Sequence, residues 1–401
     1  MTNFNEKLIF HIDVNSAFLS WSAANSLKQG EKIDLRDVAA VIGGDEQSRR
    51  GVVLAKSMIA KKSGITTGES LFTARKKCIN LIVVSPDFKL YESCSKAMRK
   101  IFGDYTPIIE KFSIDECYLD LTSYNTSKEA ALRLAYDIKD RIKCELGFTV
   151  NIGMSDVKLL AKMASDFEKP DKVHTLYKNE VEKKLWHLPV GELFMVGRRS
   201  VPKLNNLNIF TIGDLAKYDV DFLKYHFKSS GRMMWEYANG IDNREVKSDI
   251  RELKGINNST TLANDIKNRS DAYIVLLELV EHTASRLRNI KKCCYSISVT
   301  IRNNEFIDYS RSTTLKMSTD QTQEILKTVR TLFDELWRGE PIRLLGVSLN
   351  NLCNDNFKQI SIFDIDNTRD EKKRAIDKTI DSLRQKYGET VVVKSILLKK
   401  K

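Results

Sequence analysis

The 401-residue sequence lacks any run of about 18 apolar residues, the length that a membrane-spanning helix needs. Its first residues contain no apolar core followed by a cleavage site, so we expect a chain that is not secreted. The seven cysteines are odd in number and include no C-x-x-C pair, which argues against a disulfide framework or a structural zinc site. Only five histidines are present, and they are scattered. These absences favour a cytoplasmic protein without membrane contacts.

What the sequence does have is an excess of positive charge. Lys and Arg number 65 against 53 Asp and Glu, which gives a net charge of +12. Hydrophobic residues make up 42% and charged residues 29%, as in ordinary globular proteins. The length predicts several modules rather than one core. The basic balance is compatible with a polyanionic partner such as nucleic acid.

The first half alternates strand-like apolar runs with helical patterns. Asp87 and Ser127 are expected to cap helices that run to about Phe102 and Leu146. The strand-like runs are 7–14, 36–44, 51–55, 81–84 and 148–154, with a hairpin at 108–121. This order predicts a sheet with covering helices and with carboxylates at strand ends.

Two further units follow along the chain. Residues 188–240 read as short helices joined by glycine-containing turns at 196–200, 229–233 and 238–242, which is the pattern of helix-hairpin-helix units or of a small packing bundle. Residues 251–352 predict the element order β-α-β-β-α-β of a ferredoxin-like unit. The tail from Cys353 begins as a polar linker and contains a charged helix at 366–387.

Acidic residues on two separate predicted strands carry the clearest chemical signal. Asp13 lies next to the end of the run KLIFHIDV, and Asp115 and Glu116 lie in FSIDECYLD. Carboxylates that converge from rigid strand ends are suited to holding two divalent metal ions about 3.5–4 Å apart, as phosphoryl and nucleotidyl transfer require. Adjacent strand residues face opposite sides, so one of Asp115 and Glu116 should be buried or ligated. Asp120 lies outside this pair and is expected to be structural.

Taken together, the motifs resemble those of the Y-family (translesion) DNA polymerases of the DinB and UmuC type. The residues that carry the resemblance are FHIDVNSAF near the start, SIDECYLDL in the middle, NIGMSDVKLLAKMASDFEKPD at 151–171 and NSTTL at 258–262. The resemblance extends over nearly the whole chain. It implies a template-directed DNA polymerase that carries out low-fidelity translesion synthesis in DNA repair and the SOS response.

The resemblance also implies roles for individual residues. Asp13, Asp115 and Glu116 match the catalytic ligands of two Mg²⁺ ions, and the Val14 carbonyl would also face a metal. Phe18 matches the aromatic steric gate, whose ring leaves no room for a 2′-hydroxyl and so selects deoxynucleotides. Lys169, before Pro170, matches the basic residue that contacts the incoming triphosphate.

Some positions depart from the family pattern. Many members have Tyr-x-x-Arg where this chain has Met58 and Lys61, so the triphosphate-binding position 58 cannot donate a tyrosyl hydrogen bond. Lys61 can neutralise phosphate but lacks the bidentate fork of arginine. Asn15 stands where many relatives have Asp, and Ala17 where many have a second aromatic residue. These departures indicate the UmuC-like Gram-positive branch.

By resemblance, the fold is an α+β multidomain fold. It would consist of a ferredoxin-like palm, a small fingers insertion, a helical helix-hairpin-helix thumb and a ferredoxin-like little finger. The corresponding residues are 1–32 with 87–187 for the palm, 33–86 for the fingers, 188–245 for the thumb and 251–352 for the little finger, followed by the tail 353–401. The implied partners are primer–template DNA and a deoxynucleoside triphosphate, bound by a monomer through salt-dependent phosphate contacts.

The tail segment QISIFD at 359–364 fits the Q-x-x-[LI]-F pattern of peptides that bind the bacterial sliding clamp. In such peptides an apolar pair, here Ile362 and Phe363, enters a pocket while a glutamine, here Gln359, makes polar contacts. An edge strand is the alternative interpretation of so short a pattern. A tether of this kind raises the effective concentration of a polymerase at the primer end.

Two other functions remain open at this point. The segment Gly43-Gly44-Asp45-Glu46 is similar to the GGDE signature of nucleotide cyclases, but Gln47 replaces the aromatic residue that follows there. A catalytically inactive DNA-bound or clamp-bound scaffold is the other alternative, and the intact carboxylates of Asp13, Asp115 and Glu116 argue against it.

Overall fold

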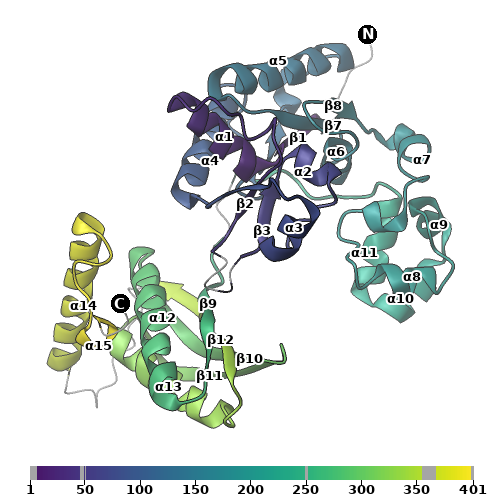
Figure 1. The fold of residues 1–401 in the computed structure, drawn as a ribbon. Coiled ribbons are helices and arrows are strands. Elements are labelled where there is room, and N and C mark those ends of the chain that lie inside the picture. Colours follow the sequence, from purple (N-terminus) through teal and green to yellow (C-terminus); the bar gives the residue numbers. More distant parts are fainter. Residues whose placement is uncertain (1–6, 46–48, 50, 249–251, 355–366, 399–401) are drawn as a thin grey trace. The chain divides into compact units, whose positions relative to one another are not determined.

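The computed structural model describes residues 7–45, 49, 51–248, 252–354 and 367–398 (Figure 1). The chain forms two compact units, one of residues 1–44 and 51–250 and the other of residues 45–50 and 251–401. Helices and sheets occur in both units, which agrees with the expected α+β class. Across the described ranges, every helix is too short or too polar to cross a membrane.

A five-stranded sheet lies at the centre of the first unit, in the order β5-β6-β1-β7-β8. Its strands are β1 Ile9–Val14, β5 Ile109–Lys111, β6 Glu116–Asp120, β7 Val150–Ser155 and β8 Val173–Thr175. Strand β1 is buried along its whole length. Because side chains alternate along a strand, Phe10, Ile12 and Val14 face one hydrophobic core, while His11 and Asp13 face the opposite side.

Helices cover both faces of this sheet. On the core side lie α1 Ala17–Lys28, α4 Phe88–Gly103 and α5 Lys128–Leu146, and α6 Lys158–Ser165 lies on the other. The Asp87 side chain accepts from the backbone N–H groups of Lys89 and Leu90, and the Ser127 side chain accepts from that of Ala130. Both expected N-caps are therefore confirmed.

Helix α6 approaches strand β7 closely because Gly153 has no side chain. A Cβ atom at this position would lie 2.0 Å from the carbonyl oxygen of Ala161 and 2.4 Å from the amide nitrogen of Ser165. The backbone of α6 therefore rests directly on the sheet. This contact places Lys162 of α6 beside Glu116 of β6 and Lys158 beside Glu110 of β5.

A small three-stranded sheet, in the order β3-β2-β4, is inserted between α1 and α4. Its elements are β2 Ala40–Gly43, β3 Val53–Lys56, α2 Met58–Lys62, α3 Leu71–Lys77 and β4 Ile82–Val84. The insertion has a core of its own that includes Val41, Val53 and Leu71.

The rest of the first unit is mostly helical. It contains α7 Val181–Lys184, α8 Val201–Asn205, α9 Ile212–Lys217, α10 Val220–Phe227 and α11 Ser229–Ala238, and α8–α11 form one bundle in Figure 1. Short 3-10 helices occupy Thr122–Tyr124, Lys178–Glu180 and Val190–Glu192.

The turn expected at 229–233 is wrong. Lys228, with a φ of 56°, makes the turn between α10 and α11, and Gly231 lies within α11. A Cβ atom on Gly231 would lie 2.2 Å from the Leu223 carbonyl oxygen, so this glycine serves the close packing of the two helices.

The second unit follows the expected β-α-β-β-α-β order. Its elements are β9 Gly255–Ile266, α12 Arg269–Asn289, β10 Lys292–Asn303, β11 Asp308–Thr319, α13 Thr322–Leu336 and β12 Ile342–Asn354. The antiparallel sheet has the order β11-β10-β12-β9, so β9-α12-β10 and β11-α13-β12 are two split β-α-β units. Two C-terminal helices follow, α14 Asn367–Tyr387 and α15 Ser395–Leu398.

Helix α14 packs on α12 through buried ion pairs rather than through an apolar face. Arg288 of α12, whose side chain is 5% exposed, forms ion pairs with Asp381 at 2.6 Å and Asp377 at 3.3 Å. Arg374 reaches Asp320 at 2.7 Å and Arg384 reaches Glu281 at 2.8 Å. The charged helix expected in the tail is thus part of the second unit.

Replacing Arg288 with alanine is expected to destabilise the second unit by about 3 kcal/mol, because it removes the cation that pairs with the largely buried carboxylate of Asp381 and leaves Asp377 with the Thr322 amide but no ion pair to Arg288. Urea unfolding monitored by circular dichroism would measure this. Arg311→Ala is the matched control, since the Arg311–Glu335 pair is about half exposed and should contribute about 1 kcal/mol or less. Equal losses for both variants would contradict the importance of the buried network.

Candidate active site

The acidic residues predicted from the sequence meet where β1 ends and β6 begins. Asp13 and Glu116 are direct register partners on these antiparallel strands, and their side chains share the face covered by α6. Asp115 immediately precedes β6, and its carbonyl oxygen accepts a hydrogen bond from the Val14 amide at 3.2 Å. The structure therefore brings together Asp13, Asp115 and Glu116, with Val14 beside them.

Each of the three carboxylates has its own partner. Lys169 forms an ion pair with Asp13, Lys162 with Glu116 at 2.5 Å, and the Ser113 hydroxyl donates to Asp115 at 2.5 Å. Asp166 connects the two lysines, at 3.1 Å from Lys162 and 2.8 Å from Lys169.

Burial and these lysines act in opposite directions on the carboxylates. Burial raises the pKa of Asp13 and that of Glu116 above their ordinary values. Lys169 opposes the rise at Asp13, and Lys162 opposes it at Glu116. The negative charges of this site are thus maintained by neighbouring cations.

The donor set suits a hard divalent cation, because all three side chains offer carboxylate oxygens. In the part of the chain that the structure describes, no three acidic, histidine or cysteine side chains are arranged around one point to hold a metal ion. The ion pairs account for this, since the carboxylates of Asp13 and Glu116 are directed at lysines. A metal ion would take the place of the ammonium groups of Lys162 and Lys169.

A cavity of about 380 Å³ lies between the end of β1 and the inserted small sheet. Its wall includes Met58, Lys61 and Lys169, the three residues that the sequence assigned to triphosphate binding. Arg36 and Lys56 add two further cations. The remaining lining residues are Val14, Asn15, Ser16, Leu19, Ser20, Leu54, Ala55, Ser57, Thr67, Thr149 and Pro170, so the lining contains four basic side chains and no acidic one.

Sequence reasoning missed two lysines of this site. Lys162 lies on α6 with its side chain only 10% exposed, and a lysine so deeply buried needs a carboxylate partner. The signal was present in the apolar context LLAKMA, where a charged residue is out of place. Lys56 gave no such signal, because it ends an ordinary short strand. Its pKa is lowered by burial and by nearby Lys61, so two ammonium groups lie close together on the cavity wall.

The Phe18 ring occupies a defined position at the start of α1. It stacks on the fully buried Tyr91 with ring centroids 4.5 Å apart and an interplanar angle of 9°. Its neighbours along the chain, Ser16, Leu19 and Ser20, line the cavity, whereas Phe18 is not among the lining residues and packs against the hydrophobic core.

Other residues singled out from the sequence lie apart from the carboxylates. Asp120 is at the far end of β6, where its side chain accepts from the Thr122 amide at 2.9 Å, in keeping with a structural role. Gly43 of the GGDE segment ends β2 in the inserted sheet, and Glu46 lies outside the described residues. Gln359, Ile362 and Phe363 also lie outside them, so the clamp-binding segment stays a prediction.

The chain is similar to known proteins in sequence and in fold. Residues 12–166 match the impB/mucB/samB family, and residues 253–362 match the impB/mucB/samB family C-terminal domain. DNA polymerase IV of Clostridium acetobutylicum is 53% identical over 98% of this chain and 99% of its own length. DNA polymerase IV of Acetivibrio thermocellus is 35% identical over 98% of each chain.

A solved structure shows the same fold. The Y-family DNA polymerase chimera Dbh-Dpo4(243-245)-Dbh superimposes with a TM-score of 0.75 and 21% identity, covering 86% of this chain and 99% of that one. Both matched family regions, the curated relatives and this fold lead to the same assignment. The chain belongs to the impB/mucB/samB family and is a Y-family DNA polymerase of the DinB and UmuC kind.

Proposed function

We propose that this chain performs low-fidelity translesion synthesis by two-metal nucleotidyl transfer. The observation that carries the proposal is the cavity with four basic and no acidic lining residues, which adjoins the carboxylates at the ends of β1 and β6. A polyanionic triphosphate would bind in the cavity, with its reacting phosphate toward the carboxylates. The primer 3′-hydroxyl would attack that phosphate, and pyrophosphate would leave.

Asp13, Asp115 and Glu116 would hold two Mg²⁺ ions, with the Val14 carbonyl as a further ligand. These ions supply a lowered pKa for the attacking hydroxyl and neutralise charge on the leaving pyrophosphate. The protein contributes rigid positions, because the register of β1 and β6 fixes Asp13 opposite Glu116. Ser113 orients Asp115 through its hydrogen bond.

Lysines on opposite sides of the cavity would bind the triphosphate. Lys61 and Lys56 are close enough to repel each other, and a bound anion would relieve this repulsion. Lys169, which pairs with Asp13 in this structure, would contact the triphosphate from the cavity wall. Lys56 adds a second positive charge, which would explain why Lys61 can bind the triphosphate at a position where many members have arginine.

Phe18 would act as the steric gate. Its ring is held by Tyr91 at the start of α1, and the chain neighbours of Phe18 line the cavity. A ring fixed in this way excludes a 2′-hydroxyl without needing a hydrogen bond of its own.

The structural units receive functional names under this proposal. Residues 1–32 and 87–187 form the palm, 33–86 the fingers, 188–245 the thumb and 251–352 the little finger, with the tail at 353–401. The small size of the fingers would leave room for a damaged template base. Both units would contact DNA mainly through phosphates, so binding should weaken steeply with salt.

Primer extension past a single abasic site tests the translesion proposal. The chain should insert a nucleotide opposite the site and extend beyond it, and its error rate on the undamaged template should be high. Efficient copying of the undamaged template with a complete stop before the abasic site would refute translesion synthesis but leave polymerase activity intact.

Phe363→Ala is expected to leave unassisted synthesis unchanged and to abolish its stimulation by a bacterial sliding clamp, because the segment QISIFD would lose its main apolar anchor. Extension assays with and without loaded clamp would measure the stimulation. Asp364→Ala serves as the neighbouring control and should retain it. Equal stimulation of Phe363→Ala and the wild-type chain would refute clamp binding through this segment.

The cyclase alternative has little support. Its GGDE segment begins at the end of β2, in a different sheet from the acidic residues Asp13 and Glu116. Conversion of nucleoside triphosphates to cyclic products without DNA would restore it.

A further inference from the structure

Two buried asparagines connect the end of β1 to the loop that carries Lys169. Asn151, on β7, is fully buried, and Asn15, just after β1, is 9% exposed. The Asn15 side-chain amide donates to the Asn151 side-chain oxygen at 3.0 Å. Asn151 is also the register partner of Asp13 on the neighbouring strand, so the side chains of Asn151 and Asp13 share one face of the sheet.

The side chain of Asn151 uses all of its hydrogen-bonding capacity. Its NH₂ group donates to the carbonyl oxygens of Glu168 at 2.6 Å and Ser165 at 3.2 Å. Its oxygen accepts from Asn15 and from the Lys172 amide at 3.2 Å. Three of these four bonds go to the segment that begins at the end of α6 and includes Lys169.

Asn15 holds the same loop from the other side. Its side-chain oxygen accepts from the Asp171 amide at 3.0 Å and from the Thr149 hydroxyl at 2.9 Å. Asp171 has a φ of 61°, a conformation that a non-glycine residue keeps only when its surroundings enforce it.

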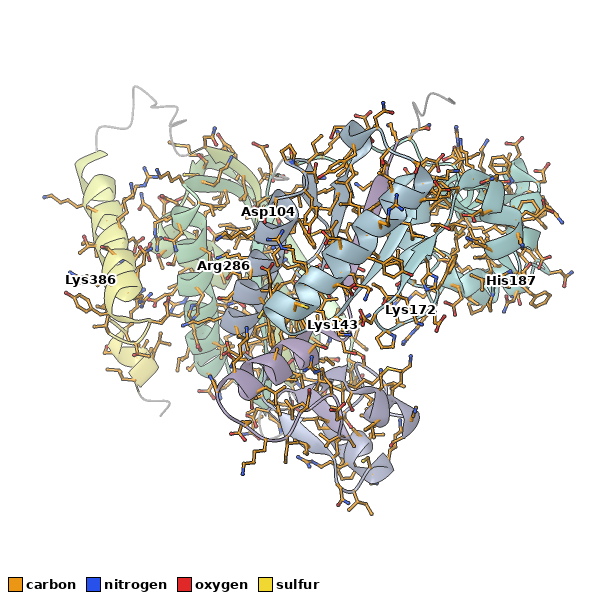
Figure 2. All side chains as sticks on the ribbon, turned by 90° about the horizontal axis from the view of Figure 1, so that it is seen from above. Asp104, Lys143, Lys172, His187, Arg286 and Lys386 are labelled. Atoms are coloured by element: carbon orange, nitrogen blue, oxygen red, sulfur yellow. The ribbon has the colours of Figure 1, made fainter. Side chains whose placement is uncertain are left out.

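The Asp171 carboxylate provides a second anchor for the loop. It forms ion pairs with Lys139 at 2.9 Å and Lys143 at 2.8 Å, both on α5. Figure 2 labels Lys143 on this helix and Lys172 in the loop. The backbone on both sides of Lys169 is therefore fixed by side chains from β7, from the β1 end and from α5.

We propose that Asn15 and Asn151 are positioning residues for Lys169, which they hold at the cavity wall for contact with the triphosphate. The inference rests on the triphosphate-binding role proposed above for Lys169. A lysine on a mobile loop would lose conformational freedom when it binds phosphate, and a loop fixed in advance reduces that cost. The buried amide pair thus converts a flexible charged side chain into part of a prepared site.

A double-mutant cycle tests this inference. Single-turnover primer extension gives the apparent nucleotide Kd and the maximal rate for the wild-type chain, Asn151→Ala, Lys169→Met and the double variant. Asn151→Ala should raise the nucleotide Kd about tenfold and change the maximal rate little. In the Lys169→Met background, Asn151→Ala should leave the nucleotide Kd within about twofold of the value for Lys169→Met alone, because the effect of Asn151 acts through Lys169.

The outcomes separate this inference from the function on which it rests. An unchanged nucleotide Kd in Lys169→Met would overturn the role proposed for Lys169, and the positioning role with it. If Lys169→Met weakens nucleotide binding, two results would overturn only the positioning role. One is that Asn151→Ala alone leaves the nucleotide Kd unchanged. The other is that Asn151→Ala raises the nucleotide Kd by the same factor in the Lys169→Met background as in the wild-type chain.

Asn151→Ala could raise the nucleotide Kd by destabilising the fold rather than by releasing Lys169, so a control for stability is needed. Asn303→Ala is the matched control, because Asn303 is 4% exposed and its side chain accepts from the amides of Glu305 and Ile307 in a turn of the second unit. It should lower the melting temperature without changing the nucleotide Kd. If Asn151→Ala does not fold, Asn15→Ala replaces it in the same cycle with the same expected result. That substitution removes the bonds to Asp171 and Thr149 but keeps the bonds from Asn151 to the loop.

Discussion

Asp115→Ala and Glu116→Ala should each reduce the rate of primer extension by at least about 10³-fold, which corresponds to about 4 kcal/mol of transition-state stabilisation. Each substitution removes a carboxylate from the point where β1 and β6 meet. Glu116→Ala also leaves Lys162 buried without its 2.5 Å partner. The assay is single-turnover extension of an undamaged primer–template with Mg²⁺ and all four deoxynucleotides.

Asp120→Ala provides the control for this prediction. Asp120 lies on the same strand, β6, but bonds only a local backbone amide at the other end. Its replacement should leave the rate within about threefold of the wild-type value, since the side-chain hydrogen bond that it removes, from the Thr122 amide, supports a local turn rather than the chemistry. Extension that persists in both Asp115→Ala and Glu116→Ala would refute the site. DNA binding measured by fluorescence anisotropy would show whether a variant extends slowly because it no longer binds the primer–template.

Phe18→Ala should raise the incorporation of ribonucleotides relative to deoxynucleotides by about 10²-fold, or about 2.7 kcal/mol of discrimination. The aromatic ring that stacks on Tyr91 at 4.5 Å would be gone, and a 2′-hydroxyl could occupy its place. The measured quantity is the ratio of kcat/KM for a deoxynucleotide to that for the corresponding ribonucleotide on the same template.

An exposed phenylalanine gives the control for the gate. Phe72, on α3 of the inserted module, is 65% exposed, and its replacement by alanine should leave sugar discrimination unchanged. A ratio for Phe18→Ala equal to that of the wild-type chain would mean that another group excludes the 2′-hydroxyl. A melting temperature for each variant shows whether the loss of the stacked ring has altered the fold.

The sequence alone was sufficient to predict that these acidic residues lie near strand ends, because strand periodicity is a local property. Asp13 is the next-to-last residue of the run IFHIDV, and the alternation of that run predicts which side chains share a face. The capped helices α4 and α5 were predictable for the same reason, since Asp87 and Ser127 bond to amides only a few residues away. The β-α-β-β-α-β order of the second unit also follows from local patterns.

Contacts between distant segments could not be predicted in this way. Lys162 and Glu116 are 46 residues apart, and Asn15 and Asp171 are 156 apart. The position of Gly231 inside α11, rather than in a turn, depends on how closely α10 packs against it. The ion pairs between α12 and α14 likewise join residues about 90 positions apart.

By itself, then, the sequence determined the family and the order of elements, and it supplied the acidic residues Asp13, Asp115 and Glu116 as a prediction, because short motifs and local periodicity encode these features. Only the tertiary structure decided which cations neutralise Asp13 and Glu116, which side chains line the triphosphate cavity, and how two asparagines hold the loop of Lys169. These features depend on long-range packing of the sheet against α6 and the inserted module. A buried charge or amide is stable only where the complete fold supplies its partner, and local sequence does not specify that partner.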